Sequence, residues 1–222
     1  MIDIQDMLLR ARRDAAEGHV EEALLQVSHA LELSESQQDR FESLLLRAQL
    51  EGGELGAPTK ALDTYWEARH LTRSHHLGRA GEADLGIGMM LIDLDRTNEG
   101  LEAIRRASRY FRKSGNTYLR ACAETILADV AICRGEDTMA ERHLEIATDL
   151  LMANNDGRML SSVLTLRAGV LGRNGRKRQA EQLLAEARRQ AGDLHDPDVE
   201  AELQGLRTAV RQSIAIAAGD EL

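Results

Sequence analysis

The residues of this chain that could do chemistry include a histidine pair, His75 and His76, which could bind a metal ion with a third ligand. Adjacent side chains in a turn point apart. No cysteine or carboxylate cluster stands near them at the spacing that zinc sites use. We therefore interpret the pair as part of a solvated loop, and we expect neither a metal nor another cofactor.

Two cysteines, Cys122 and Cys133, could form a disulfide, a metal site or a redox pair. On an expected helix their eleven-residue separation corresponds to roughly 16 Å at about 1.5 Å per residue. A disulfide needs a Cα separation of about 4.4–6.8 Å, so an internal bond is excluded. Free cysteines commonly pack as small apolar side chains, which is the role we expect for both. Reduced cysteines and the lack of an apolar leader favour a cytoplasmic location.

Basic residues gather in two places, and each group could meet an acidic partner or a phosphate backbone. The alternative is that each group is a solvated helix face. The chain carries a formal net charge of −9, which argues against direct binding of nucleic acid, because that needs an excess of Lys and Arg. The two groups are Arg105, Arg106, Arg109, Arg112 and Lys113, and Arg173, Arg176, Lys177 and Arg178.

Catalytic motifs are missing from the sequence. It has no Gly-rich phosphate loop, no nucleophile elbow and no HExxH pair. Gly86-Ile87-Gly88 lies in a helical pattern with no strand before it, so it is not a dinucleotide fingerprint. No apolar run approaches the roughly 20 residues of a transmembrane helix. We predict that the protein is not an enzyme, has no catalytic residues and does not bind a membrane.

The elements that must position these side chains are helices. Only two prolines occur in 222 residues, and aromatic residues make up 3%. Helix-forming residues dominate, and the many small alanines allow helices to pack closely. The composition therefore predicts an all-α fold with a core of leucine and alanine.

An internal repeat predicts how these helices are arranged. In the segment 135–147, Gly135 is followed by Ala140 and Ala147, and two turns of helix return a side chain to nearly the same face. A pair of small residues at this spacing recurs along the chain, with the second members 38 to 40 residues apart. The pairs are Ala23 and Ala30, Ala61 and Ala68, Gly100 and Ala107, Ala140 and Ala147, and Ala180 and Ala187.

The first helix of each hairpin carries a signature of its own, a large apolar residue followed by a small one. Leu46-Arg47-Ala48 has counterparts at Leu9-Arg10-Ala11 and Leu166-Arg167-Ala168, while Ile87-Gly88 and Leu127-Ala128 stand at matching places. The pattern predicts one domain, 1–222, of about five helical hairpins and a C-terminal capping helix at about 198–216. The hairpins are expected at about 4–33, 39–74, 79–114, 117–153 and 158–191.

Local signals predict the ends of individual elements. Helices are expected over about 4–16 and 20–33, and an irregular, glycine-rich turn is expected from Gly52 to Pro58. Thr97-Asn98-Glu99 and Glu136-Asp137-Thr138 are expected to cap the second helices that follow them.

These hairpins resemble tetratricopeptide (TPR) repeats over about residues 4–191. The resemblance rests on Gly18…Ala23…Ala30, Gly135…Ala140…Ala147 and Gly175…Ala180…Ala187. Units of 38–40 residues without a closing proline are more similar to the long TPR variety of bacterial sensor and transcription-regulator proteins than to chaperone adaptors. The resemblance implies a right-handed superhelical solenoid whose first helices line a concave groove.

Mapping this groove onto the chain gives the candidate partner-binding residues. At least one of Met89 and Met90 should face it, where a flexible thioether can adapt to a ligand. The Lys and Asn that grip a C-terminal carboxylate in chaperone-type TPR proteins are absent, so the resemblance argues against that ligand. The candidates are Arg12, Gln49, Leu85, Met89, Asp93, Thr125, Asp129, Thr165 and Arg173.

Three functions are compatible with this interpretation. The first is a non-catalytic scaffold or adaptor that binds a protein or peptide in the groove. The second is a regulatory module of a bacterial signalling or transcription system, in which a small ligand or a peptide shifts the superhelix between two curvatures. The third is homo-oligomerisation, with Ile214 and Ile216 of the terminal helix forming a homodimer contact.

Overall fold

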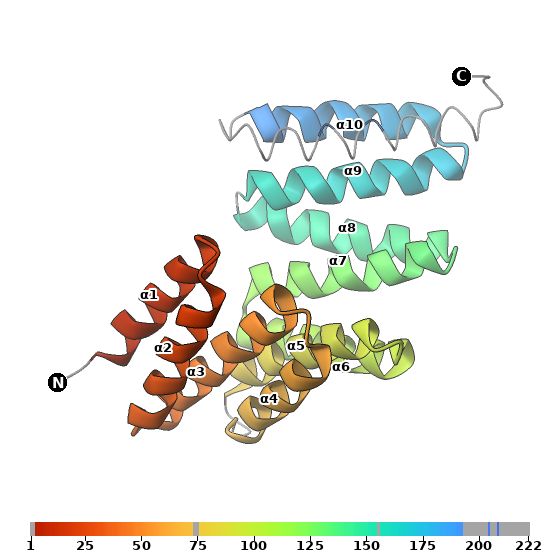
Figure 1. Ribbon diagram of the computed structural model, residues 1–222. Helices are drawn as coiled ribbons and strands as arrows, with labels where there is room; N and C mark the ends of the chain where they lie inside the picture. Colours follow the sequence, from red (N-terminus) through yellow and green to blue (C-terminus); the bar gives the residue numbers. More distant parts are fainter. Residues whose placement is uncertain (1–2, 73–75, 155, 193–203, 205–207, 209–222) are drawn as a thin grey trace. The chain divides into compact units, whose positions relative to one another are not determined.

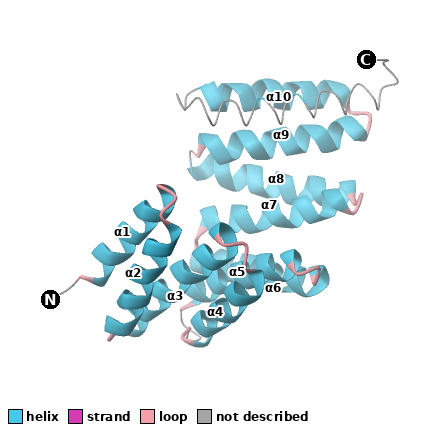
Figure 2. Cartoon of the chain, viewed as in Figure 1, coloured by secondary structure: helices cyan, strands magenta, loops and turns pink. Residues whose placement is uncertain are grey.

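The computed structural model describes residues 3–72, 76–154, 156–192, 204 and 208. In these residues all regular secondary structure is helical, and no strand is present (Figure 2). The predicted all-α fold of helical hairpins is confirmed. The α-helices are α1 (Ile4–Ala16), α2 (Val20–Leu33), α3 (Gln37–Gln49), α4 (Pro58–His70), α5 (Leu77–Asp93), α6 (Thr97–Ser114), α7 (Thr117–Cys133), α8 (Asp137–Asn154), α9 (Gly157–Arg173) and α10 (Lys177–Gly192).

The chain divides into two compact units, Met1–Gly115 and Asn116–Leu222. Unit 1 contains the hairpins α1–α2, α3–α4 and α5–α6, and unit 2 contains α7–α8 and α9–α10 (Figure 1). The predictions of a single domain and of a right-handed superhelix apply to both units taken together, and both remain predictions. The expected capping helix at 198–216, with its homodimer contact, lies outside the described residues apart from Gln204 and Thr208.

Four of the hairpins turn in the same way. Gly18, Asp95, Gly135 and Gly175 have φ angles of 87°, 60°, 71° and 74°. In each turn this residue donates its N–H to the carbonyl three positions back, and the next residue donates to the carbonyl five positions back. This pair of bonds defines the Schellman motif, which closes a helix with a left-handed residue. Three of the four positions hold glycine, which adopts a positive φ without a steric penalty.

The α3–α4 hairpin is the irregular one, as predicted. After α3 the backbone continues as a π-helix, η1 (Leu50–Glu54), and α4 then begins at Pro58, where its missing N–H is not needed. Within η1, Glu51 is only 3% exposed. Its carboxylate accepts hydrogen bonds from Arg47 Nε at 3.0 Å and from Thr64 Oγ1 at 2.7 Å, which ties α3 to α4.

The expected caps on second helices are wrong for α6. Its N-cap residue is Arg96, without a side-chain capping bond. The Arg96 N–H closes the preceding turn on Leu91 O at 2.8 Å, and its guanidinium has no acceptor atom with which to cap the helix. Side-chain caps occur instead at the starts of first helices. They are Asp3, Ser36, Asn116 and Asp156.

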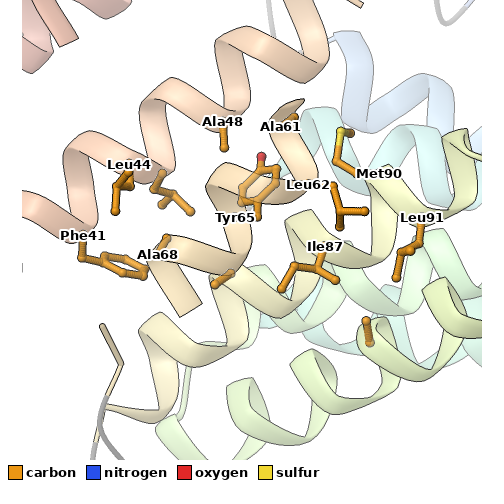
Figure 3. Close-up of a cluster of buried hydrophobic side chains, with 13 residues drawn as sticks. Phe41, Leu44, Ala48, Ala61, Leu62, Tyr65, Ala68, Ile87, Met90 and Leu91 are labelled. Atoms are coloured by element: carbon orange, nitrogen blue, oxygen red, sulfur yellow. The ribbon is translucent and has the colours of Figure 1, made fainter. Parts of the chain in front are cut away.

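The core lies between the helices at the predicted small residues. Figure 3 shows Ala48, Ala61 and Ala68 between α3 and α4, close to Tyr65 and to Ile87 of α5. All three alanines are wholly buried. Burial raises the pKa of Tyr65 to about 12, because its phenolate would lose solvation. The small-residue pairs of the other four hairpins are buried as well, as the repeat predicts.

None of the helices in the described ranges is long and apolar enough to cross a membrane.

Candidate functional site

The first helices of unit 1 expose side chains at one repeat position. Arg12, Gln49 and Met89 each follow the buried small residue of their helix's signature, and all three are exposed. The reason is geometric, because successive residues of an α-helix point about 100° apart. Met89 is 43% exposed and Met90 is 6% exposed, so one methionine of the pair is open to solvent.

Leu85 and Asp93 lie one turn before and one turn after Met89 on α5. Leu85 is half-buried and Asp93 is exposed. Residues four apart share a helix face, so these three side chains form one surface, here called the α5 stripe. It is apolar at Leu85, flexible at Met89 and acidic at Asp93. None of the three is joined to another described residue by a side-chain hydrogen bond or ion pair.

On α7, in unit 2, Thr125 and Asp129 occupy the matching positions. Thr125 is half-buried and donates its hydroxyl to Ala121 O of its own helix at 2.9 Å. Asp129 is exposed as a whole residue. Partial loss of solvation nevertheless raises the pKa of its carboxyl to about 6. The α7 face is therefore more polar than the α5 stripe.

The two candidates on α9 differ in exposure. Arg173 is exposed and binds Asp137 at the start of α8, with Nη2 at 2.7 Å from Oδ1. Thr165 is wholly buried, and its hydroxyl is donated to Ser161 O at 2.8 Å. A buried, bonded hydroxyl is not available to a partner, so Thr165 does not contribute to the exposed face.

The histidine and cysteine predictions are met only in part. His76 is exposed, whereas His75 lies outside the described residues. Cys122 and Cys133 are both free, as their spacing requires. Cys122 is half-buried, 3.8 Å from Met159 Sδ, but Cys133 is exposed, so the expected apolar packing is wrong for Cys133. Within the described part of the chain, no three His, Cys, Asp or Glu side chains gather as a metal site requires.

Besides Glu51, two buried carboxylates on first helices were not predicted from the sequence. Asp84 is 1% exposed and Glu124 is 5% exposed. They stand one repeat apart, each four residues before the small residue of its first helix. Leu44 and Leu164 fill the same position in two other hairpins. An acid where the other repeats have leucine or methionine was the signal, and it becomes visible only after the units are aligned on their small residues.

The Asp84 carboxylate is held by two arginines from neighbouring second helices. Its Oδ1 accepts from Arg69 Nε of α4 and from Arg106 Nη2 of α6, each at 3.3 Å. Its Oδ2 accepts from Arg106 Nε at 3.3 Å. A buried carboxylate needs such charged partners to offset its lost hydration. The cluster thus ties α4, α5 and α6 together.

These arginines open onto a pocket of about 410 Å³, here called the α4–α6 pocket. Arg69 is fixed in it by Thr72 Oγ1, 2.7 Å from Nη1, and lies 5.7 Å from the ring centroid of Tyr110. Trp66 is 39% exposed, with its ring centroid 6.3 Å from that of His70. The lining is Trp66, Arg69, His70, Thr72, Asp84 and Arg106.

Glu124 in unit 2 has different partners. Its Oε2 lies 2.7 Å from His143 Nδ1 of α8, and its Oε1 lies 4.0 Å from Arg120 Nε. The same repeat position therefore supports a carboxylate–guanidinium cluster in one hairpin and a carboxylate–imidazole pair in the next.

Known structures with similar folds are TPR proteins. A Rap protein complexed with Competence and Sporulation Factor superposes with a TM-score of 0.76 at 16% identity, over 95% of this chain and 65% of that one. MamA gives 0.60 at 16% identity, over 87% and 97% of the two chains. A thermophilic TPR protein of Thermus thermophilus gives 0.58 at 20% identity, over 92% and 98%. The chain therefore has a TPR-like fold.

By sequence, no protein-family model and no curated protein matches this chain.

Proposed function

We propose that the chain is a non-catalytic scaffold that binds a protein or peptide through the exposed faces of its first helices. The observation that carries this proposal is the exposure of Met89 in the middle of the α5 stripe. A long apolar side chain at 43% exposure can gain binding energy when a partner covers it, and its flexibility suits an adaptable contact.

The neighbouring positions give this surface its polar selectivity. Arg12 and Gln49 present a cation and an amide at the same repeat position as Met89. Asp93 supplies an acid one turn further along α5. A partner would place an apolar side chain over Met89 and polar groups near the others, which is the usual division between the centre and the rim of an interface.

In unit 2 the proposed binding residues are Asp129 and Arg173, with Thr125 as a half-buried neighbour of Asp129. Arg173 is already paired with Asp137, so a partner carboxylate would have to compete with that bond. Asp129 has no such partner among the described residues. We therefore expect Asp129 to contribute more to binding than Arg173.

The sensing function is the second candidate, supported by the likeness to the Rap protein that was solved with Competence and Sporulation Factor. In this function a peptide or small ligand would occupy the same first-helix faces and change the arrangement of the hairpins. The chain spans 65% of that Rap chain, so an output resembling that of the larger protein would require a further domain or a partner.

The scaffold proposal is tested by comparing two matched methionines. Met89 lies on a first helix and Met139 on the second helix α8, and they are 43% and 41% exposed. Immobilised wild type, Met89→Glu and Met139→Glu are each incubated with native cell extract, and the retained proteins are quantified by mass spectrometry. We expect Met89→Glu to reduce retention of a specific partner about tenfold, since the few residues that matter most in an interface each cost more than about 1 kcal/mol when they are changed, and Met139→Glu to leave it unchanged.

Two results would reject the proposal. In the first, both variants retain the partner as well as wild type does. In the second, Met139→Glu loses the partner, so that binding lies away from the α5 stripe. Circular dichroism spectra of the variants establish that each is folded before retention is compared.

A further inference from the structure

The α4–α6 pocket contains an arginine whose hydrogen-bonding capacity is only partly used. Arg69 engages all three of its nitrogens, with Asp84, Thr72 and Tyr110. Arg106 gives Nε and Nη2 to Asp84. Its Nη1 has no hydrogen-bond partner among the residues that the structure describes, and 36% of its side chain is exposed. The pocket therefore presents free N–H donors on a cation.

The charge of the lining is also unbalanced. The two guanidinium groups carry two positive charges, and Asp84 supplies a single negative one. One positive charge remains in excess, and its partial burial makes it attract an anion more strongly than an arginine in bulk water would.

Helix α6 continues this positive surface beyond the pocket. Between Thr97 and Ser114 it contains five basic and two acidic residues, a net charge of +3 in a chain of −9. Arg109 and Lys113 follow Arg106 at three and seven residues, so they share its helix face. Both are exposed, and neither forms a salt bridge within the described ranges. Helix α4 has two basic and two acidic residues and is balanced.

We propose that the α4–α6 pocket and the basic face of α6 bind an acidic segment of a protein partner, with one Glu or Asp side chain in the pocket. The carboxylate accepts hydrogen bonds from Arg106 Nη1, and its methylene groups pack against the half-exposed ring of Trp66. Further acids of the segment lie along Arg109 and Lys113. The residues that line this pocket include none of the residues proposed for the scaffold function, so variants can test the two proposals independently.

The charge distribution favours a carboxylate over the other anions. The single excess charge in the pocket matches a monoanionic carboxylate, whereas a phosphate group carries about −1.5 to −2. A nucleic acid is a dense polyanion, and the negative charge of the whole chain opposes its approach at long range. A short acidic segment needs only the local positive surface of α6.

Trp66 makes the pocket directly observable, because it is the only tryptophan in the chain. An acetylated, amidated hexaglutamate peptide is titrated into the full protein while the tryptophan emission is recorded. Hexaglutamine of the same length serves as the uncharged control peptide. We expect a saturable change with hexaglutamate, weakened by added salt, and no change with hexaglutamine.

Variants with effects of opposite sign separate binding from structural support. Arg106→Gln should weaken hexaglutamate binding about tenfold, the range for a charged hydrogen bond, and the exposed Arg109→Gln about threefold. Asp84→Asn should tighten binding, because the internal carboxylate no longer competes for the arginines. Arg142→Gln on α8 of unit 2 makes the same charge change at an exposed position that does not line the pocket, and it should leave the affinity unaltered.

Either of two results overturns the proposal. The first is unchanged affinity in Arg109→Gln and in folded Arg106→Gln, because the arginines would then serve only to hold Asp84. The second is saturation of the Trp66 signal by inorganic phosphate or an oligothymidylate at a lower concentration than by hexaglutamate, which would assign the pocket to phosphate or to nucleic acid.

Discussion

The hairpins α5–α6 and α7–α8 share one backbone plan and differ in what they place on it. Helices α5 and α7 begin at residues 77 and 117 and each contain 17 residues, while α6 and α8 begin at 97 and 137 and each contain 18. Every residue of one hairpin therefore has a counterpart 40 positions along. The comparison shows which properties belong to the repeat and which belong to a single hairpin.

The small-residue positions differ in how closely they bring the helices together. In α5–α6 these positions hold Gly88 and Gly100, and a Cβ added to Gly100 would lie 2.7 Å from Gly88 O. In α7–α8 the same positions hold Ala128 and Ala140, and both residues are wholly buried. The repeat fixes where the helices cross, and the size of the residue there fixes their separation.

The exposed and buried polar positions differ more strongly. Met89 corresponds to Asp129, and Asp84 with its two arginines corresponds to Glu124 with His143. These exchanges leave the lengths of the helices unchanged. Surface chemistry can therefore vary from one hairpin to the next while the packing plan is kept, which is the property that a binding scaffold needs.

Among these predictions, we expect the largest change in stability from Gly100→Ala. The new methyl group would meet backbone, which cannot rotate away as a side chain can, so the two helices must separate. We expect the free energy of unfolding to fall by about 3 kcal/mol, the upper range for overpacking, in spite of the better helix propensity of alanine. Urea denaturation followed by circular dichroism measures this change.

The matched control is Ala140→Gly in the other hairpin. It removes a buried methyl group and adds backbone freedom, for an expected loss of about 1–2 kcal/mol. If Gly100→Ala is as mild as this control, or stabilises the protein, the backbone contact in α5–α6 is not as close as we describe.

The turns of the two hairpins make a second, smaller test. Asp95 and Gly135 are counterparts with φ angles of 60° and 71°. A side chain in this region costs roughly 1–2 kcal/mol, somewhat less for aspartate. We therefore expect Gly135→Ala to lower the free energy of unfolding by about 1 kcal/mol and Asp95→Gly to raise it by about 0.5 kcal/mol.

Thermal denaturation of both turn variants provides the measurement. The two shifts in melting temperature should have opposite signs. If Asp95→Gly lowers the melting temperature, then Asp95 stabilises the turn through its side chain, and the two turns are not equivalent.

Much of this plan could be predicted from the sequence because it depends on residue size and on local stop signals. The bounds of α1 and α2 and the start of α4 at Pro58 agree with the prediction. The small-residue pairs are buried because a helical crossing tolerates nothing larger there. These features need only periodicity and turn chemistry.

The rest depends on contacts between segments distant in the sequence. Asp84 is buried because Arg69 and Arg106 reach it from α4 and α6, 15 and 22 residues away. Thr165 was expected on an exposed face, but its environment buries it. The π-helix Leu50–Glu54 was not predicted either, and the bond between Glu51 and Thr64 of the next helix is a contact that no local pattern indicates. A single sequence does not reveal which partner a polar side chain will find.

The smallest expected effect is a pH-dependent change in stability at Asp129, the counterpart of the apolar Met89. Its pKa rises from 3.8 to about 6, because the folded protein removes part of the solvation of its carboxylate. The folded state thus holds this proton more tightly than the unfolded chain, so Asp129 costs nothing below pH 3.8 and destabilises the fold increasingly as the pH rises through 6. Asp129→Asn removes this cost. We expect a gain below about 1 kcal/mol at about pH 8, since water screens an exposed side chain, and no gain near about pH 3.5. Urea titrations at the two pH values measure the difference, and an equal gain at both would show that the charge of Asp129 is not its cause.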